Sequence, residues 1–171
     1  MSVRPPSDDA PPVAADPFAS HDHSRCAQAV LARAEAQARA GGLRLTPVRR
    51  RVLEILLESH RALGAYDVLE RLSAEGYGKQ PPVAYRALDF LVEQGLAHRV
   101  RRLNAYAACV SDQRDHSPAF LICRQCETVA EAESPELREA LGGLCAANGF
   151  APERRTVELL GLCSRCAGDA A

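Results

Sequence analysis

Apolar residues recur at helical spacing in three stretches of the chain between residues 46 and 95. The first stretch places its apolar side chains on one face, at Val48, Val52, Ile55 and Leu56. Thr46 and Pro47 precede this face as an N-cap and a first helical residue, because a hydroxyl can accept a free backbone N–H and proline lacks one. The pattern predicts a helix that begins at Pro47.

Three further helices follow from composition and spacing. Residues 24–40 are rich in Ala, Arg and Gln and are followed by a Gly-Gly pair, which favours a helix there. The second stretch begins after Gly64 and ends at Gly76, with inward positions at Val68, Leu69 and Leu72. The third follows a Pro-Pro pair and ends at Gly95, with inward positions at Ala84, Leu88, Leu91 and Val92.

The segment after the third stretch alternates between polar and apolar residues. Residues 96–109 show this strand pattern on both sides of a turn at Leu103 and Asn104. Short helices followed by a basic hairpin form the layout of a winged helix-turn-helix domain. In such domains the last helix enters the major groove of DNA and the hairpin touches the backbone.

The second half of the chain has a different pattern. Strands are predicted at 116–123, 128–133 and 156–163, and a helix is predicted from Ser134 to about Asn148. These elements indicate a small α/β domain. The predicted fold class is therefore α+β, with an N-terminal winged helix-turn-helix domain followed by a small α/β domain.

The predicted domain boundaries follow changes in composition. Residues 1–23 are rich in Pro, Ala, Asp and Ser without an apolar period, which predicts a disordered arm. The winged-helix domain is predicted at 24–103 and the second domain at 104–171.

Charge separates the two halves of the chain. The net charge of the 171 residues is −1, but residues 44–102 carry 11 Lys and Arg against 7 Asp and Glu, a net +4. Residues 103–171 carry 6 against 10, a net −4. This asymmetry favours contact between the first domain and nucleic-acid phosphates.

The chain shows neither a secretory signal nor an apolar run of about 20 residues, so we expect a cytoplasmic protein.

Four of the seven cysteines form two Cys-x-x-Cys turns, Cys123 with Cys126 and Cys163 with Cys166. Two such turns supply four sulfur ligands for a tetrahedral zinc ion, and both follow a predicted strand. A redox dithiol is the competing interpretation, but one such motif suffices for that chemistry. A site of four thiolates has no open position for catalysis, so we expect a structural zinc.

The same motifs carry a resemblance to a known family. Residues 26–166, including GLRLTPVRRRVLEIL, AYDVLERL, PPVAYRALDFLVEQGL and the two cysteine turns, resemble the ferric uptake regulator family and within it the zinc uptake regulators. The family's usual Thr-Val-Tyr-Arg in the recognition helix is Val83-Ala84-Tyr85-Arg86 in this chain. The resemblance implies a DNA-binding repressor that acts as a homodimer, with the second domain as the dimerisation domain.

The resemblance also implies a DNA-contacting surface. Its residues are expected to be Arg44, Tyr66, Tyr85 and Arg86 at the grooves, and Arg99, Arg101 and Arg102 of the hairpin at the phosphates. Arginine can present two donors to guanine, and tyrosine can pack against the thymine methyl group. Hairpin arginines would add affinity that depends on salt and not on sequence.

A second, regulatory zinc site is implied at the junction of the domains. Its expected ligands are His98, Cys109, His116 and Glu131. One ion bound by all four would fix the angle between the domains and so the spacing of two recognition helices in a dimer. The Cys109 thiolate favours zinc over iron and manganese. Iron and manganese sensors of the family also carry a His-His-Asp-His run, and this chain has Asp112-Gln-Arg-Asp-His116 in its place, which again favours zinc.

Several alternatives stay open from the sequence. The chain could sense iron or manganese, or Cys109 and the paired cysteines could form a thiol redox switch. A further metal site could involve His21, His23 and Cys26, near the arm. We expect no enzymatic activity, since no HExxH or similar motif accompanies the cysteines, and no membrane or small organic substrate as a partner.

Overall fold

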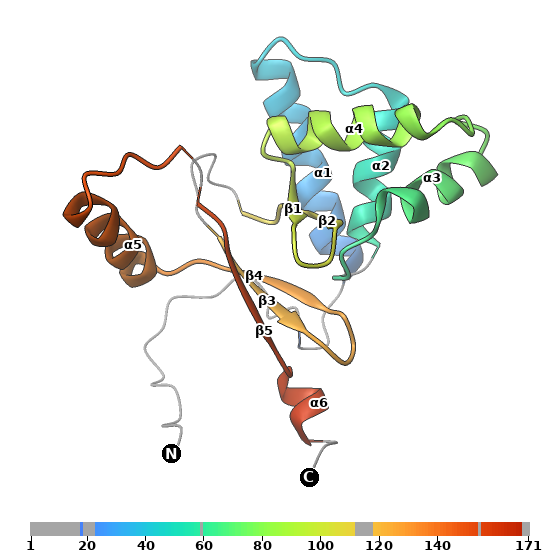
Figure 1. Ribbon diagram of the computed structural model, residues 1–171. Helices are drawn as coiled ribbons and strands as arrows, with labels where there is room; N and C mark the ends of the chain where they lie inside the picture. Colours follow the sequence, from blue (N-terminus) through green and yellow to red (C-terminus); the bar gives the residue numbers. More distant parts are fainter. Residues whose placement is uncertain (1–17, 19–22, 59, 112–117, 154, 169–171) are drawn as a thin grey trace.

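The computed structural model describes residue 18 and residues 23–58, 60–111, 118–153 and 155–168 (Figure 1). The first half of the chain forms α1 (His23–Ala40), α2 (Pro47–Leu57), α3 (Ala65–Ala74), α4 (Pro81–Glu93), β1 (Ala97–Val100) and β2 (Ala105–Ala108). The second half forms β3 (Ala119–Cys123), β4 (Val129–Ala132), α5 (Pro135–Ala147), β5 (Val157–Gly161) and α6 (Ser164–Gly168). Figure 1 shows the first four helices gathered beside the β1–β2 hairpin, with the second sheet below it and α5 standing to one side.

The first four helices share one apolar core. Its fully buried side chains include Leu53, Ile55, Leu72, Leu88 and Leu91. Burial of each such side chain stabilises the fold by about 1.5–3 kcal/mol. These side chains therefore hold the four helices together in one domain.

The helix ends form as their sequences predict. Thr46 Oγ1 accepts the backbone N–H of Arg49 at 3.4 Å, and Pro47 is the first residue of α2. Gly76 and Gly95 follow α3 and α4 with φ values of 83° and 67°, a left-handed conformation that a side chain would strain. The predicted boundaries of these helices are confirmed.

A network of ion pairs joins the outer faces of α2 and α3. Arg51 Nε and Nη2 donate to the Glu75 carboxylate at 2.6 and 2.7 Å, and Nη2 also donates to Glu58 at 3.1 Å. Arg71 contacts the same Glu58. The hydrogen bonds from Arg51 hold the pKa of Glu75 below its usual value, and Glu75 raises the pKa of Arg51. Such exposed pairs orient side chains but contribute little stability each.

The hairpin is extended by the segment between α2 and α3. β1 and β2 are antiparallel, with Val100 opposite Ala105 across the turn. The backbone groups of Leu63 and Tyr106 exchange hydrogen bonds of 2.9 and 2.8 Å. The hairpin is thus held to the helical domain along its β2 edge.

The second sheet has the strand order β4–β3–β5, with β4 antiparallel and β5 parallel to β3. A parallel pair needs a crossover connection, and α5 lies within it. None of the α5 residues is buried, and Leu159 and Leu160 of the edge strand β5 are exposed. The second domain therefore leaves apolar surface uncovered in the single chain.

The hairpin packs directly on the second sheet. A buried cluster between them consists of Val100, Phe120, Ile122 and Val129. The Val129 N–H donates to His60 O at 2.8 Å, and Arg61 Nε donates to Cys126 O at 3.1 Å. The two halves therefore meet through the hairpin and the 60–63 segment.

The predicted strands, hairpin and helices are present, and the sequence analysis missed the short helix α6. The proposed domain boundary between residues 103 and 104 falls inside the hairpin, because β2 pairs with β1. A division after Val110 keeps both strands in one domain, and we propose it in place of the boundary between residues 103 and 104.

Most of the predicted arm lies outside the described residues. Within the described ranges, no helix has the length and apolar character needed to cross a membrane.

Candidate metal centres and nucleic-acid interface

The four paired cysteines come together at one end of the second sheet, and we refer to them as the cysteine site. The sulfur atoms of Cys123, Cys126, Cys163 and Cys166 all lie within 4.8 Å of one another. Cys126 Sγ and Cys163 Sγ are 3.8 Å apart. Sulfurs at the corners of a tetrahedron around zinc lie about 3.8 Å apart, since each Zn–S bond is about 2.3 Å long. The donor set and its spacing fit a structural zinc.

Parallel pairing of β3 and β5 brings the two cysteine turns to the same edge. Cys123 ends β3 opposite Gly161 of β5. The Arg124 N–H donates to Gly161 O at 2.9 Å, and the Cys163 N–H donates to Cys123 Sγ at 3.4 Å. Cys166 follows on α6, whose first turn directs it back to the site. The tertiary pairing, and not the sequence spacing, closes this cluster.

Hydrogen bonds and burial act differently on the sulfurs. Backbone N–H groups of Cys126 and Cys163 lower the pKa of Cys123 to about 6. The Thr128 hydroxyl lowers the pKa of Cys126, whereas burial raises the pKa of Cys166 to about 12. Four thiolates in one cluster therefore require a cation, and bound zinc would supply that positive charge.

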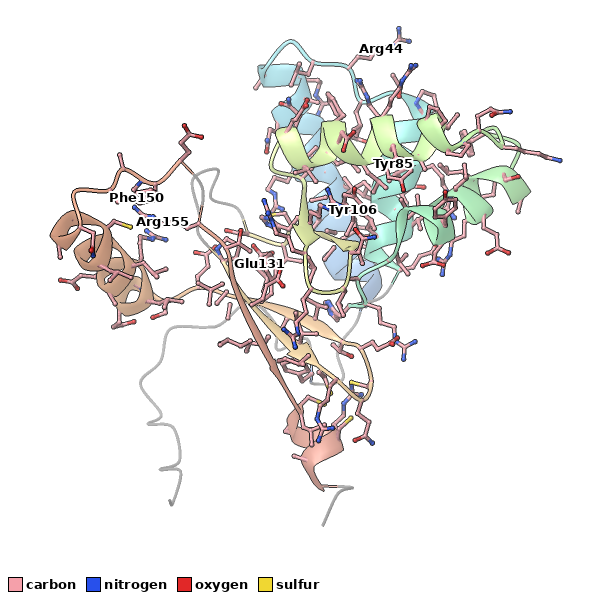
Figure 2. All side chains as sticks on the ribbon, in the orientation of Figure 1. Arg44, Tyr85, Tyr106, Glu131, Phe150 and Arg155 are labelled. Atoms are coloured by element: carbon pink, nitrogen blue, oxygen red, sulfur yellow. The ribbon has the colours of Figure 1, made fainter. Side chains whose placement is uncertain are left out.

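Three of the four expected regulatory ligands meet where the hairpin packs on the second sheet, and we call this group the hinge site. His98 lies on β1, Cys109 follows β2 and Glu131 lies on β4, with all three ligand atoms within 4.8 Å of one another. Glu131 Oε1 lies 3.2 Å from His98 Nε2 and 3.8 Å from Cys109 Sγ. The fourth, His116, lies outside the described residues. Figure 2 shows Glu131 near the centre of the molecule, between its two halves.

The donor set of the hinge site fits zinc. A nitrogen, a thiolate and a carboxylate are ligands that zinc accepts, and a fourth ligand would complete a tetrahedron. Cys109 is 1% exposed, and burial together with the Glu131 charge raises its pKa to about 12. A metal must therefore displace a proton to bind Cys109, which couples metal binding to proton release.

Neighbouring groups hold the hinge ligands in place. The Val110 N–H donates to Glu131 Oε2 at 3.0 Å, which leaves Oε1 facing His98 and Cys109. The Arg33 guanidinium of α1 donates to the backbone oxygens of Cys109 and Val110 at 2.9 and 3.1 Å. The chain segment that carries Cys109 is therefore bound by α1 on one side and by the second sheet on the other.

The side chains expected at DNA bases lie on the surface of the helical domain. Tyr66 is 70% exposed at the start of α3, and Tyr85 and Arg86 are exposed near the start of α4. Arg44 extends from the loop before α2, on the side away from the second domain (Figure 2). These positions are compatible with a contact surface, and the DNA contacts of these residues remain predictions.

Arg49 is a residue that the sequence analysis did not single out. Its guanidinium lies 3.6 Å from the Phe90 ring and donates to Arg44 O at 2.9 Å. Arg49 thus connects the Arg44 loop to α4. An arginine among three consecutive arginines gave no sequence signal for this role.

The hairpin that carries the three arginines makes polar contacts within the chain. Arg99 Nη2 donates to Asn104 Oδ1 at 3.0 Å. The backbone N–H groups of Arg101 and Arg102 donate to the Glu158 carboxylate of the second domain at 2.7 and 2.9 Å. All three arginines are exposed, so their predicted contact with phosphates stays a prediction. The structure adds an internal carboxylate at the same turn.

The side chains of His21, His23 and Cys26 are not among those described. The further metal site predicted from these three residues therefore lies outside the described part of the chain. Two other side chains, those of Arg33 and Glu158, make long-range contacts that the sequence analysis did not predict. Each acts on a backbone group more than 50 positions away, and no local spacing signals such a contact.

Comparison with known proteins places the chain in a family. The profile of the Ferric uptake regulator family matches residues 40–160. The Zinc uptake regulation protein of Escherichia coli (strain K12) is 39% identical over 140 residues, which are 81% of this chain and 82% of that protein.

Solved structures show the same similarity. A zinc uptake regulator complexed with zinc and DNA has a TM-score of 0.80 at 37% identity, with 85% of this chain and 98% of that chain covered. Holo XcZur has a TM-score of 0.72 at 35% identity, with 86% and 99% covered, whereas apo XcZur has 0.50 at 36%, with 84% and 99% covered. This chain is therefore more similar in structure to holo XcZur than to apo XcZur.

These similarities confirm the predicted fold class of a winged helix followed by a small α/β domain. The profile match spans more than half of the chain, and the match to the E. coli protein spans most of both sequences. The chain belongs to the ferric uptake regulator family of transcription regulators.

Proposed function

We propose that this protein is a zinc-responsive transcriptional repressor that binds operator DNA as a zinc-loaded homodimer and controls zinc-uptake genes. The observation that carries the proposal is the hinge site, in which ligands from both halves of the molecule meet. His98 and Cys109 belong to the hairpin side, and Glu131 belongs to the second sheet. The similarity to a zinc uptake regulator complexed with zinc and DNA supports both the metal and the partner.

Two zinc ions per chain fit the two clusters. The cysteine site lies within the second domain, where a closed set of four sulfurs stabilises the fold. The hinge site would use His98, Cys109, Glu131 and, from the resemblance, His116. Its ligands come from separate domains, so its occupancy depends on their arrangement.

The uncovered apolar surface of the second domain supports a homodimer. Leu144 of α5, Phe150 after it, and Leu159 and Leu160 of β5 are 45–64% exposed. α5 stands away from the helical domain in Figure 1. Exposed apolar side chains on an edge strand and on the helix that precedes it in the chain mark surfaces that a second chain can cover. Two copies joined there would present two α4 helices to DNA.

Regulation then follows from linkage between the hinge site and DNA. Metal at the hinge joins the hairpin to the second sheet and favours one angle between the domains. In a dimer, that angle sets the spacing of the recognition helices, which must match half-sites about one helical turn apart. Because coupling is reciprocal, operator DNA should strengthen zinc binding by the same factor, typically about 5–150-fold.

The thiolate of Cys109 favours zinc over iron and manganese, which prefer nitrogen and oxygen ligands. A thiol redox switch is the second candidate, because Cys109 and the cysteine site contain the sulfurs it would need. Burial that raises the pKa of Cys109 to about 12 argues against a switch at Cys109, since the thiolate is the form that oxidises readily.

Operator affinity measured against free zinc, iron and manganese tests the proposal. The protein should be purified with the cysteine site loaded and its metal content counted per chain. We expect tight binding only when a second zinc is bound, with iron and manganese much less effective. Equal affinity with one and two zinc ions per chain would contradict the proposal. Loss of binding with peroxide at constant zinc would instead favour the redox switch.

A further inference from the structure

The turn of the hairpin is held by a carboxylate from the second domain. The turn comprises residues 101–104, between β1 and β2. Glu158 Oε1 accepts the Arg101 N–H at 2.7 Å, and Oε2 accepts the Arg102 N–H at 2.9 Å. Two successive backbone N–H groups that face one carboxylate form an anion-binding concavity, and charge-assisted hydrogen bonds of this kind are the strong ones.

Glu158 lies in the same row of the second sheet as the hinge ligand Glu131. In the strand register, Phe120 of β3 is opposite Glu131 of β4 and opposite Glu158 of β5. Residues directly opposite each other in a sheet point to the same face. The ring of His98 lies 5.3 Å from the ring of Phe120, so this face is the one that meets the hairpin.

The two carboxylates of this row, Glu131 and Glu158, therefore contact the hairpin at its two ends. Glu131 contacts the open end of the hairpin, where His98 begins β1 and Cys109 follows β2. Glu158 contacts the closed end, at the turn. Beside the hairpin, a cleft of about 990 Å³ lies between the end of α4 and Pro152, Glu153, Arg155 and Thr156. The angle between the domains is thus set at the hairpin and at the adjoining 60–63 segment.

We propose that Glu158 is a positioning residue that latches the second domain to the hairpin turn and preorganises the hinge site for zinc. The latch uses no hinge ligand, so it favours the closed arrangement before metal binds. A ligand binds more weakly when its competent arrangement is less populated, so loss of the latch should weaken zinc binding at the hinge. This inference rests on the proposed function, because it assigns the hinge site to zinc.

The test uses the full chain with the cysteine site loaded, and zinc as the probe. A second equivalent of zinc is titrated against a competing chelator in wild type, Glu158→Ala and Glu158→Gln. We expect zinc affinity at the hinge to fall roughly tenfold in both variants, within the usual range of coupling. The glutamine should not rescue the latch, because its amide NH₂ would face one of the two N–H donors.

Hydrogen exchange separates the latch from general stability. The amides of Arg101 and Arg102 should exchange faster in both variants, while the amides of α4 stay as protected as in wild type. Glu153→Gln is the matched control, since it removes one exposed carboxylate from the segment that leads to β5. It should bind zinc as the wild type does.

The outcomes distinguish the latch from the function on which it rests. Wild-type zinc affinity in both Glu158 variants, despite faster exchange at the turn, would overturn the latch and leave the regulator intact. Full rescue by glutamine would also overturn it, because the charge and two acceptors would then be unnecessary. If the wild type takes up no second zinc at the hinge, the proposed function itself fails.

Discussion

The cysteine site and the hinge site both offer ligands that zinc accepts, but they are built in opposite ways. The cysteine site draws all four sulfurs from two turns of one domain, at the ends of paired strands. The hinge site draws its ligands from strands of two domains, and the segment that carries Cys109 is held by groups from both. A site within one domain can stabilise a fold but cannot report on domain arrangement. A site divided between two domains can do so, because its geometry changes when they move.

The largest effect is expected at the cysteine site. Cys123→Ser should remove zinc from the cluster and unfold the second domain, because structural zinc can contribute about 10 kcal/mol or more of apparent binding free energy. That is comparable with the whole stability of a domain, about 5–15 kcal/mol. Circular dichroism, size-exclusion chromatography and zinc content would measure the change. Cys145→Ser, on α5, is the control and should retain its zinc. A folded, zinc-free dimer of Cys123→Ser would remove the distinction between the two sites.

A smaller and different effect is expected at the hinge. Cys109→Ala should keep the fold, the dimer and the zinc of the cysteine site but lose most of the zinc dependence of DNA binding. Operator affinity at saturating zinc should fall by roughly 100-fold, toward the value of the one-zinc protein. Fluorescence anisotropy with operator DNA would measure it. Tight, zinc-dependent binding by this variant would show that Cys109 is not a regulatory ligand.

Arg33→Ala sharpens the comparison because it leaves all ligands of both sites in place. Loss of the guanidinium should free the backbone at Cys109 and Val110 and weaken zinc binding at the hinge by about tenfold. The cysteine site should be unaffected. Arg39→Ala, an exposed position in the last turn of the same helix, is the control. Equal zinc titrations for the two variants would mean that the hinge segment needs no support from α1.

The smallest effect is expected away from both sites. Glu75→Gln breaks the pair with Arg51 on the outer face of the helical domain. Because Arg51 lowers the pKa of Glu75 in the folded chain, the pair stabilises the fold above the usual pKa of glutamate, and this contribution is lost as the pH falls through the lowered value. Urea unfolding at neutral and acidic pH should show a slight loss in the variant at neutral pH and less difference in acid. Changed zinc affinity at either site would show unexpected coupling to the surface.

Local patterns were sufficient to predict most of the elements. The helix that begins at Pro47, the ends at Gly76 and Gly95, and the hairpin turn all rest on neighbouring residues whose conformations are locally restricted. Each of the two Cys-x-x-Cys turns also carries a short-range signal. These features could be read without knowledge of the fold, and the structure agrees with them.

Only the tertiary structure decided which distant groups meet. Parallel pairing of β3 with β5 placed Glu158 level with Glu131, and this register brought one carboxylate to each end of the hairpin. Arg33 reached the Cys109 backbone through the packing of α1. Sequence determines such contacts only through the whole fold. Almost any residue type can supply the backbone group in such a hydrogen bond, so the residue type at that position does not reveal the contact.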